Sequence, residues 1–384
     1  MRAAAGKVRR RGAPWVWRRL LEEWHAPTTG LGRFLHGCFR IAVVAAMRVV
    51  AWPFRAILGG PAHVTVFYDL AVSPVTYDVA WALAAGEMAR RDANLASVRL
   101  VIVPGPHRGL RREDDDYEAV VDHAARIWRL DNIVLPMARL LPSVDEVLHG
   151  GSRGRAVLEL ALARGPVYPL GYGPFLPVAP IPLDVLGPAC AGRPVPLPLR
   201  ASEQARRHVD IWLAARAAGR KAVVITLRQY GYGAARNSNL DAWLAFARRM
   251  DTTIYAPIFV PDTQTALAPA LAPGVAHVFS EAAWNIGLRM ALYERAHLNL
   301  MVNTGPHLLC MFNEHCRYVM FKILTPSVRQ TSDEYMRFLG FQIGGQPPFA
   351  TVFQKWVWEG DALEVIEREF GAMCQVIERR EAVP

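Results

Sequence analysis

A strand, a glycine turn and a helix follow one another in the stretch KAVVITLRQYGYGAARNSNLDAWLAFARRM, residues 221–250. Its first part, 222–227, is a short apolar run rich in β-branched residues, which predicts a buried strand. Its last part carries apolar residues at helical spacing, with Asn237 or Ser238 as the expected N-cap. This order of elements is typical of an α/β fold built on a parallel sheet.

The turn inside this stretch carries the charges that predict a binding site. Arg228 stands at the strand's end and Arg236 stands just before the helix. A helix N-terminus offers free N–H groups, and arginines supply forked positive charge. We therefore expect a nucleotide diphosphate to bind Arg228, Arg236 and the residues that lead into the helix, Asn237, Ser238 and Asn239. The alternative is that the arginines only neutralise carboxylates around them.

The positive charge of the chain is concentrated in residues 1–60. They hold eleven Lys or Arg and two acidic residues, whereas the other 324 residues are almost neutral. A neutral body argues against nucleic acid as a partner and for a basic extension with a partner of its own. The five cysteines are an odd number without CxxC spacing, which argues against a zinc site or a disulfide framework and favours a reducing cytosol.

Four arginines punctuate an apolar stretch of this extension at spacings of 7, 8 and 7 residues: Arg33, Arg40, Arg48 and Arg55. At about 100° per residue they share one side of a helix. A spanning helix would bury Arg48 in hydrocarbon at a cost of about 2.5–3.5 kcal/mol. We therefore expect residues 1–58 to bind an anionic membrane surface through an amphipathic helix, at the cytoplasmic face of the inner membrane. A true span, or docking on the protein's own surface, are the alternatives.

Residues 61–165 predict a first α/β domain. Apolar runs at 63–69, 98–103 and 132–135 are expected strands, and 75–91 and 116–128 are expected helices, the first begun by Ser73 and Pro74. Alternation of this kind predicts a parallel sheet with helices on both faces. Asp69 follows the first strand, where ligand clefts form in such sheets, and it is our candidate general base, with Asp78 as the second choice. Asp69 could equally cap the turn after it.

Ten prolines fall between residues 166 and 198, a density that excludes a helix or a central strand. We interpret 166–200 as a crossover to a second α/β domain, residues 201–384. Its expected strands are 222–227, 254–260, 275–279, 298–302 and 318–323, and its last helix begins at Asp361, which has capping-box spacing to Glu364. Two doubly wound, Rossmann-like domains joined in this way and closed by a C-terminal helix predict the GT-B architecture.

Two motifs within residues 221–325 add a resemblance to known families. The segment LNLMVNTGPHLLCMF, 298–312, resembles the strand–DTGPxHLA–helix element of the lipopolysaccharide heptosyltransferases. Arg228 followed by RNSN is similar to the arginine of the protein O-fucosyltransferases that meets the donor pyrophosphate. In the heptosyltransferases the loop meets the donor's phosphates and sugar, which implies donor-binding roles for Asn303, Thr304 and Gly305.

The heptosyltransferase-like segment 298–312 departs from its family at two places. Asn303 stands where the family has aspartate. His307 is one position early, and Leu308 occupies the place of the family's histidine. The resemblance therefore implies phosphate binding through Thr304 and backbone N–H groups, and it assigns no role to His307.

Together these features predict a glycosyltransferase of polysaccharide biosynthesis that uses a nucleotide-diphosphate sugar and transfers its sugar to a glycan or a lipid-linked acceptor. Arg228 would stabilise the leaving diphosphate and Asp69 would serve as base. Positive side chains and helix dipoles can stabilise that leaving group, so we expect neither a metal nor a cofactor. A sugar-nucleotide epimerase and a non-catalytic GT-B-like sugar-nucleotide-binding protein are the alternatives.

Overall fold

The computed structural model describes residues 60–180, 182–186, 197–267 and 274–382, with a few positions between 38 and 54. The four arginines of the predicted extension helix, Arg33, Arg40, Arg48 and Arg55, lie outside these residues. The chain divides into two compact units. Unit 1 contains the chain as far as Ser73 with residues 89–112 and 146–179, and unit 2 contains residues 74–88, 113–145 and 180–384. Among the described residues, no helix combines the length and the apolar character that crossing a bilayer requires.

Unit 1 is built on a four-stranded sheet with the strand order β3-β2-β1-β4. β1 pairs in parallel with β2 on one side and with β4 on the other. Helix α8 packs Ala156 and Leu160 into a buried cluster with Phe67, Val101 and residues near them. The elements of this sheet and its helix are β1 (Val64–Asp69), β2 (Val98–Val103), β3 (Val144–Leu148), α8 (Arg153–Leu162) and β4 (Val167–Tyr168).

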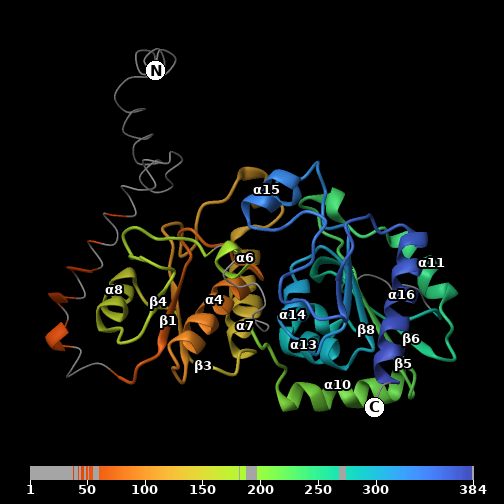
Figure 1. Cartoon of the computed structure of the whole chain (residues 1–384). Helices are drawn as coiled ribbons and strands as arrows, with labels where there is room; N and C mark the ends of the chain where they lie inside the picture. The colour runs from red at the N-terminus through yellow and green to blue at the C-terminus, as the bar shows by residue number, and fades with distance from the viewer. Residues whose placement is uncertain are drawn as a thin grey trace, which may run out of the picture. The chain divides into compact units, whose positions relative to one another are not determined.

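Unit 2 is built on a six-stranded sheet with the order β10-β9-β8-β5-β6-β7, in which the strands pair in parallel. Helices α11 and α16 cover one face, whereas α13 and α14 lie on the other (Figure 1). The strands are β5 (Lys221–Thr226), β6 (Tyr255–Val260), β7 (His277–Val278), β8 (Leu298–Val302), β9 (Tyr318–Phe321) and β10 (Gln354–Trp356). The predicted α/β class with two parallel sheets is confirmed.

The helices of this part of unit 2 alternate with its strands, as a doubly wound sheet requires. They are α9 (Leu183–Leu186), α10 (Glu203–Arg216), α11 (Leu240–Arg249), α12 (Glu281–Trp284), α13 (Ile286–Arg295), α14 (His307–Met311), α15 (Asp333–Phe338) and α16 (Leu363–Glu381), with single turns of 3-10 helix η3 (Ala234–Arg236), η4 (Thr263–Thr265) and η5 (Arg329–Thr331).

Two earlier stretches of the chain also pack into unit 2. The first half of α4 (Val79–Asp92) brings Trp81, whose ring lies 5.0 Å from that of Phe312 and 6.1 Å from that of Phe341. Residues 115–139 add only helical segments to unit 2, and the last of them, α7, contacts α13. These segments are α5 (Asp115–Glu118), α6 (His123–Arg129), the π-helical turn η1 (Leu130–Val134) and α7 (Leu135–Arg139).

Several element predictions were wrong. The apolar run 132–135 is helical, because a short apolar run can be a buried helix as well as a strand. Helix α4 begins at Val79 and not at Ser73 and Pro74. The N-cap of α11 is Asn239, whose Oδ1 accepts from Ala242 N at 3.3 Å, in place of Asn237 or Ser238. The proline-rich stretch contains the edge strand β4 and the short helix α9.

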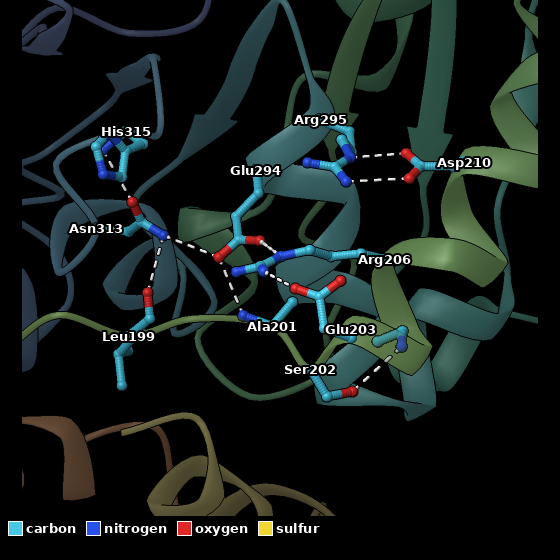
Figure 2. Close-up of polar contacts among 11 residues, drawn as sticks. Leu199, Ala201, Ser202, Glu203, Arg206, Asp210, Glu294, Arg295, Asn313 and His315 are labelled. Carbon is cyan, nitrogen blue, oxygen red and sulfur yellow. Dashed lines mark hydrogen bonds and ion pairs between the residues drawn. The ribbon is translucent and has the colours of Figure 1, made fainter. Parts of the chain in front are cut away.

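Glu294 organises the entry of the chain into helix α10. Its carboxylate accepts from Arg206 Nε at 2.8 Å, from Ala201 N at 3.0 Å and from Asn313 Nδ2 at 3.2 Å (Figure 2). Asn313 also donates to the carbonyl of Leu199 at 2.8 Å. One carboxylate of α13 therefore holds the segment 199–206, which leads into α10, against α13.

Candidate functional site

Arg228 lies at the carboxyl end of β5 and holds the turn that follows it. The residue is only 6% exposed. Its Nη2 donates to the carbonyl of Tyr232 at 2.7 Å, and its Nη1 donates to the carbonyl of Gly233 at 3.1 Å and to Oδ1 of Asn237. Gly233 has φ of +63°, in the left-handed region that favours glycine. The guanidinium thus fixes a turn that the sequence alone identifies only by its glycines.

The polar residues before α11 complete this turn. The Asn237 side chain bonds both backbone groups of Tyr230, each at 3.1 Å. Ser238 Oγ accepts from Arg228 N at 2.9 Å, and Ser238 N donates back to the Arg228 carbonyl at 2.9 Å. Asn237 and Ser238, both predicted to bind donor, therefore shape the loop through side-chain bonds, while Asn239 caps the helix.

Asp361 stands at the N-terminus of α11 and not at the cap of α16. The predicted capping box was wrong, because α16 begins at Leu363 after Ala362 without a side-chain cap. The buried carboxylate of Asp361 accepts from Asn239 N at 2.7 Å and from Trp243 Nε1 at 2.9 Å. Lys322 lies 3.8 Å from its other oxygen. The chain thus supplies its own anion to the helix end where we expected a phosphate.

Arg236 joins the turn to the loop that follows β8. Its Nη2 donates to the carbonyl of Asn303 at 3.2 Å. The side chain of Asn303 is itself hydrogen-bonded within the protein: its Nδ2 donates to the carbonyl of Ile323 at 2.8 Å. The Nε of Arg236 is buried and has no hydrogen-bond partner. The structure therefore brings Arg228, Arg236 and the 303–305 loop together at the carboxyl edge of the sheet.

Two carboxylates act on these arginines by charge alone, Asp262 on Arg228 and Asp78 on Arg236. Among the described residues, neither guanidinium forms an ion pair with Asp or Glu. Burial and the neighbouring Arg236 lower the pKa of Arg228 to about 10. Burial also lowers the pKa of Arg236, against the opposing effects of Asp78 and Tyr232. Two neighbouring guanidinium groups whose pKa values are lowered in this way favour an anion between them.

The 303–305 loop leads into α14 through His307. Its backbone N and its ring Nδ1 both bond the carbonyl of Thr304, at 3.1 and 2.5 Å. A carbonyl can only accept, so Nδ1 carries the proton and Nε2 is an acceptor. Burial and Arg236 lower the pKa of His307 to about 4, so the ring is neutral near pH 7. Thr304 itself is buried, with 8% exposure.

Arg129 and Tyr230 belong to the same region, although sequence reasoning missed them. Arg129 of α6 donates to the hydroxyl of Tyr230 and, at 3.1 Å, to that of Tyr117. The guanidinium carbons of Arg129 and Arg228 lie 5.2 and 5.7 Å from the centre of the Tyr230 ring. Nothing in the sequence around Arg129 signals this, because the residue lies about one hundred positions from its partner.

Asp262 is a half-buried carboxylate whose charge acts on Arg228. It follows β6 at the same edge, and it accepts from the backbone N–H groups of Gln229 and Gln264 at 3.3 and 3.4 Å. Burial raises its pKa, against the effect of those two bonds and of Arg289 and Arg228. The strand-end position that singled out Arg228 in the sequence applies equally to Asp262.

The two candidate bases have different surroundings. Asp69, in unit 1, is fully buried and accepts two bonds from Arg153, at 2.8 and 3.0 Å, and one from the hydroxyl of Tyr172 at 2.8 Å. Arg153 also donates to the carbonyl of Pro104 at 2.8 Å, so this pair joins loops at the carboxyl edge of the first sheet. Asp78, in unit 2, is exposed, immediately precedes α4 and accepts from Thr76 Oγ1 at 2.8 Å.

A groove of about 630 Å³ lies at the opposite, amino-terminal edge of the sheet of unit 2. It is also rich in basic residues, but two of its arginines are paired. Arg295 makes two bonds to Asp210, at 2.7 and 3.0 Å (Figure 2), and Arg317 lies 2.8 Å from Glu381. The carboxyl edge therefore differs from this groove: among the described residues Arg228 and Arg236 form no ion pair with Asp or Glu, whereas Arg295 and Arg317 do.

No protein-family model matches the sequence, and no curated protein matches it. Solved structures do match. One is a glycosyl transferase of family 9 from Veillonella parvula, with 9% identity and a TM-score of 0.47 over 82% of this chain and 97% of that one. The E. coli ADP-heptose lipopolysaccharide heptosyltransferase II has 10% identity and a TM-score of 0.46 over 82% and 99%. A fucosyltransferase from Bradyrhizobium has 10% identity and a TM-score of 0.26 over 66% and 94%. In structure, this chain is thus similar to these three glycosyltransferases.

Proposed function

We propose that this protein is a glycosyltransferase that uses a nucleotide-diphosphate sugar as donor. The observation that carries the proposal is the pair Arg228 and Arg236, which stand close together at the carboxyl edge of a parallel sheet and, within the described part of the chain, form no ion pair with Asp or Glu. Buried charge of one sign is costly unless an opposite charge binds to it. A diphosphate supplies that charge in a form that guanidinium forks fit.

In this proposal the arginines and the 303–305 loop hold the diphosphate. Arg228 makes three bonds within its loop and has five N–H donors, so two donors remain for phosphate oxygens. Arg236 offers its unpartnered Nε. Thr304 and the backbone of Gly305 approach from the second loop. Negative charge on the departing diphosphate grows in the transition state, so these groups lower the barrier as well as bind the donor, and the reaction needs no metal.

We assign the general base to Asp78. An acceptor hydroxyl must lose its proton as it attacks, and a base must reach it within hydrogen-bond distance. Asp78 is exposed, and its charge acts on Arg236. Asp69 was our first candidate from sequence, but its carboxylate is fully buried and held by Arg153 and Tyr172. That pair would have to open before Asp69 could contact any substrate.

The acceptor in this proposal is a glycan or a lipid-linked sugar at the cytoplasmic face of the inner membrane. The supporting feature is the basic extension, whose eleven Lys or Arg over 60 residues suit an anionic lipid surface. An enzyme held at the bilayer meets lipid-linked acceptors at high local concentration.

The test begins with thermal-shift measurements of the full-length protein against a panel of nucleotide-diphosphate sugars and the free nucleotides. A ligand at 100 times its dissociation constant stabilises by about 2.7 kcal/mol, which such a measurement resolves. The best donor, labelled in its sugar, is then incubated with and without lipid-linked glycan acceptors. We expect label in the acceptor and free nucleotide diphosphate in equal amount.

The other outcomes separate the alternatives. Label that stays on the nucleotide in a changed sugar identifies an epimerase. A thermal shift with a nucleotide sugar but no turnover identifies a binding protein. No shift with any nucleotide contradicts the site assignment as a whole.

A further inference from the structure

The ring of Tyr77 packs directly on Gly305. A Cβ atom placed on Gly305 would lie 2.7 Å from Cδ2 of Tyr77, 3.2 Å from its Cγ and 3.4 Å from its Cβ. Real Cβ atoms do not approach other atoms as closely as 2.7 Å, so any side chain here displaces the ring. Gly305 is not among the glycines with positive φ. The position therefore needs glycine because of the ring and not because of its backbone.

Asp78 is the next residue after Tyr77 and is tied to the same loop by charge. It immediately precedes α4, where its carbonyl accepts from Trp81 N at 3.0 Å. Its carboxylate acts on Arg236, and Arg236 donates to the carbonyl of Asn303 at 3.2 Å. Two links therefore run between this turn and the donor loop, one through the Tyr77 ring and one through Arg236.

We propose that Tyr77 is a positioning residue: its ring, seated on Gly305, fixes where the Asp78 carboxylate stands relative to the loop that holds the donor. This deepens the proposed function and rests on it. A base and a donor on separate loops need a rigid link, because a displacement of about 1 Å can cost about 100-fold in rate. The Tyr77–Gly305 contact is such a link, made from a residue adjacent to the base.

The ring, and not the hydroxyl, makes this contact. Burial raises the pKa of Tyr77, with the charge of Asp262 adding to the rise and those of Arg289 and Arg129 opposing it. The phenol therefore stays protonated near pH 7 and supplies no charge to the reaction. Phenylalanine keeps every atom that meets Gly305, whereas alanine removes the ring.

The experiment measures turnover with the best labelled donor, and separately the affinity for the free nucleotide diphosphate, in the full-length protein. The variants are Tyr77→Phe, Tyr77→Ala and Gly305→Ala, with Gly371→Ala as the control. Gly371 lies within α16, and a Cβ there meets nothing within 4 Å. We expect Tyr77→Phe and Gly371→Ala to keep kcat, and the other two to lower it by about 100-fold with nucleotide affinity unchanged.

A double variant distinguishes positioning from damage to the fold. Once Tyr77→Ala has removed the ring, the added methyl of Gly305→Ala has nothing to displace. The double variant should therefore be no slower than Tyr77→Ala alone, a non-additivity that unrelated structural damage would not produce.

Each remaining result decides against one idea. If Tyr77→Ala keeps kcat, or if Tyr77→Phe loses as much as Tyr77→Ala, the positioning role is overturned while the transferase assignment stands. If Gly305→Ala loses nucleotide affinity as well as turnover, the contact shapes the binding loop and not the base. A wild-type protein that transfers no sugar from any donor overturns the proposed function, and this inference with it.

Discussion

At the scale of single residues, Arg228 is the residue on which the proposed function depends most. Three bonds from its Nη atoms hold the turn, and its remaining donors are available to a ligand. A lysine is a point charge that cannot make this set of bonds. We expect Arg228→Lys and Arg228→Ala to lower kcat/KM similarly, by about 2.7–4 kcal/mol in transition-state stabilisation.

Arg216→Ala is the matched control for Arg228, because Arg216 is exposed at the end of α10. Donor affinity and turnover are measured for all three variants, with circular dichroism to check the fold. A folded Arg228→Ala protein that binds and transfers as the wild type does would remove the site assignment.

Substitution of the two candidate aspartates should affect stability and turnover in opposite ways. Asp69→Asn removes a fully buried carboxylate that pairs with the half-buried Arg153, and breaking a buried pair costs up to about 3–5 kcal/mol. Asp78→Asn changes an exposed carboxylate, so it should leave the free energy of unfolding near that of wild type while abolishing most turnover. Urea denaturation and turnover assays on both variants check this. If the Asp78→Asn variant transfers sugar at the wild-type rate, another group is the base.

At the scale of elements, the N-terminus of α11 depends on a residue more than one hundred positions away. Asp361 accepts from Asn239 N and from Trp243 Nε1 with one carboxylate oxygen. Hydrogen bonds to a charged group contribute about 1.5–3 kcal/mol, so Asp361→Asn should lower the free energy of unfolding by about that amount. Glu364→Ala, three residues further on, should have little effect, which urea denaturation of both variants will show.

Two histidines near opposite edges of the sheet of unit 2 should make stability depend on pH. Burial lowers the pKa of both to about 4, with Lys221 and Arg317 assisting at His297 and Arg236 at His307. The unfolded chain, with an ordinary pKa of 6.5, binds more protons between these values. The free energy of unfolding should therefore be unaffected by these groups above about pH 6.5 and fall as pH drops from there towards 4.

Substitution with glutamine tests this effect directly. His297→Gln and His307→Gln should each lose less stability than wild type between pH 7 and pH 5, as measured by urea denaturation. An unchanged acid sensitivity in both would mean that carboxylates account for the loss instead.

The elements also show what the sequence can and cannot predict. The strand β8 was predicted with its exact bounds, because an apolar run is a local signal. Arg228 was predicted as a site residue because it stands at the end of a buried strand. The same reasoning could not predict Tyr77 or Arg129, whose roles depend on contacts with residues more than one hundred positions away. Asp361 was assigned to the wrong helix for the same reason. Its capping-box spacing indicated α16, the helix nearest in sequence, whereas its bonds go to the N-terminus of α11.

At the scale of the whole molecule, membrane binding through the basic extension can be tested separately from catalysis. Fractionation of cells should place the full-length chain with membranes, and high salt should release it, because salt screens exposed charge. A shortened chain beginning at residue 60 should appear in the cytosolic fraction. Equal partitioning of the two chains would contradict membrane binding through residues 1–58.

Unit 2 is assembled from three separate stretches of sequence, so recombination between related chains can separate residues that pack together. A chimera joined within the proline-rich segment would inherit Arg236 and Gly305 from one parent, but Tyr77 and Arg129 from the other. Its glycine would then meet a foreign side chain in place of its own tyrosine. Under the proposed function, donor preference should therefore pass intact between related chains only when residues 74–88 and 113–145 are exchanged together with residues 201–384.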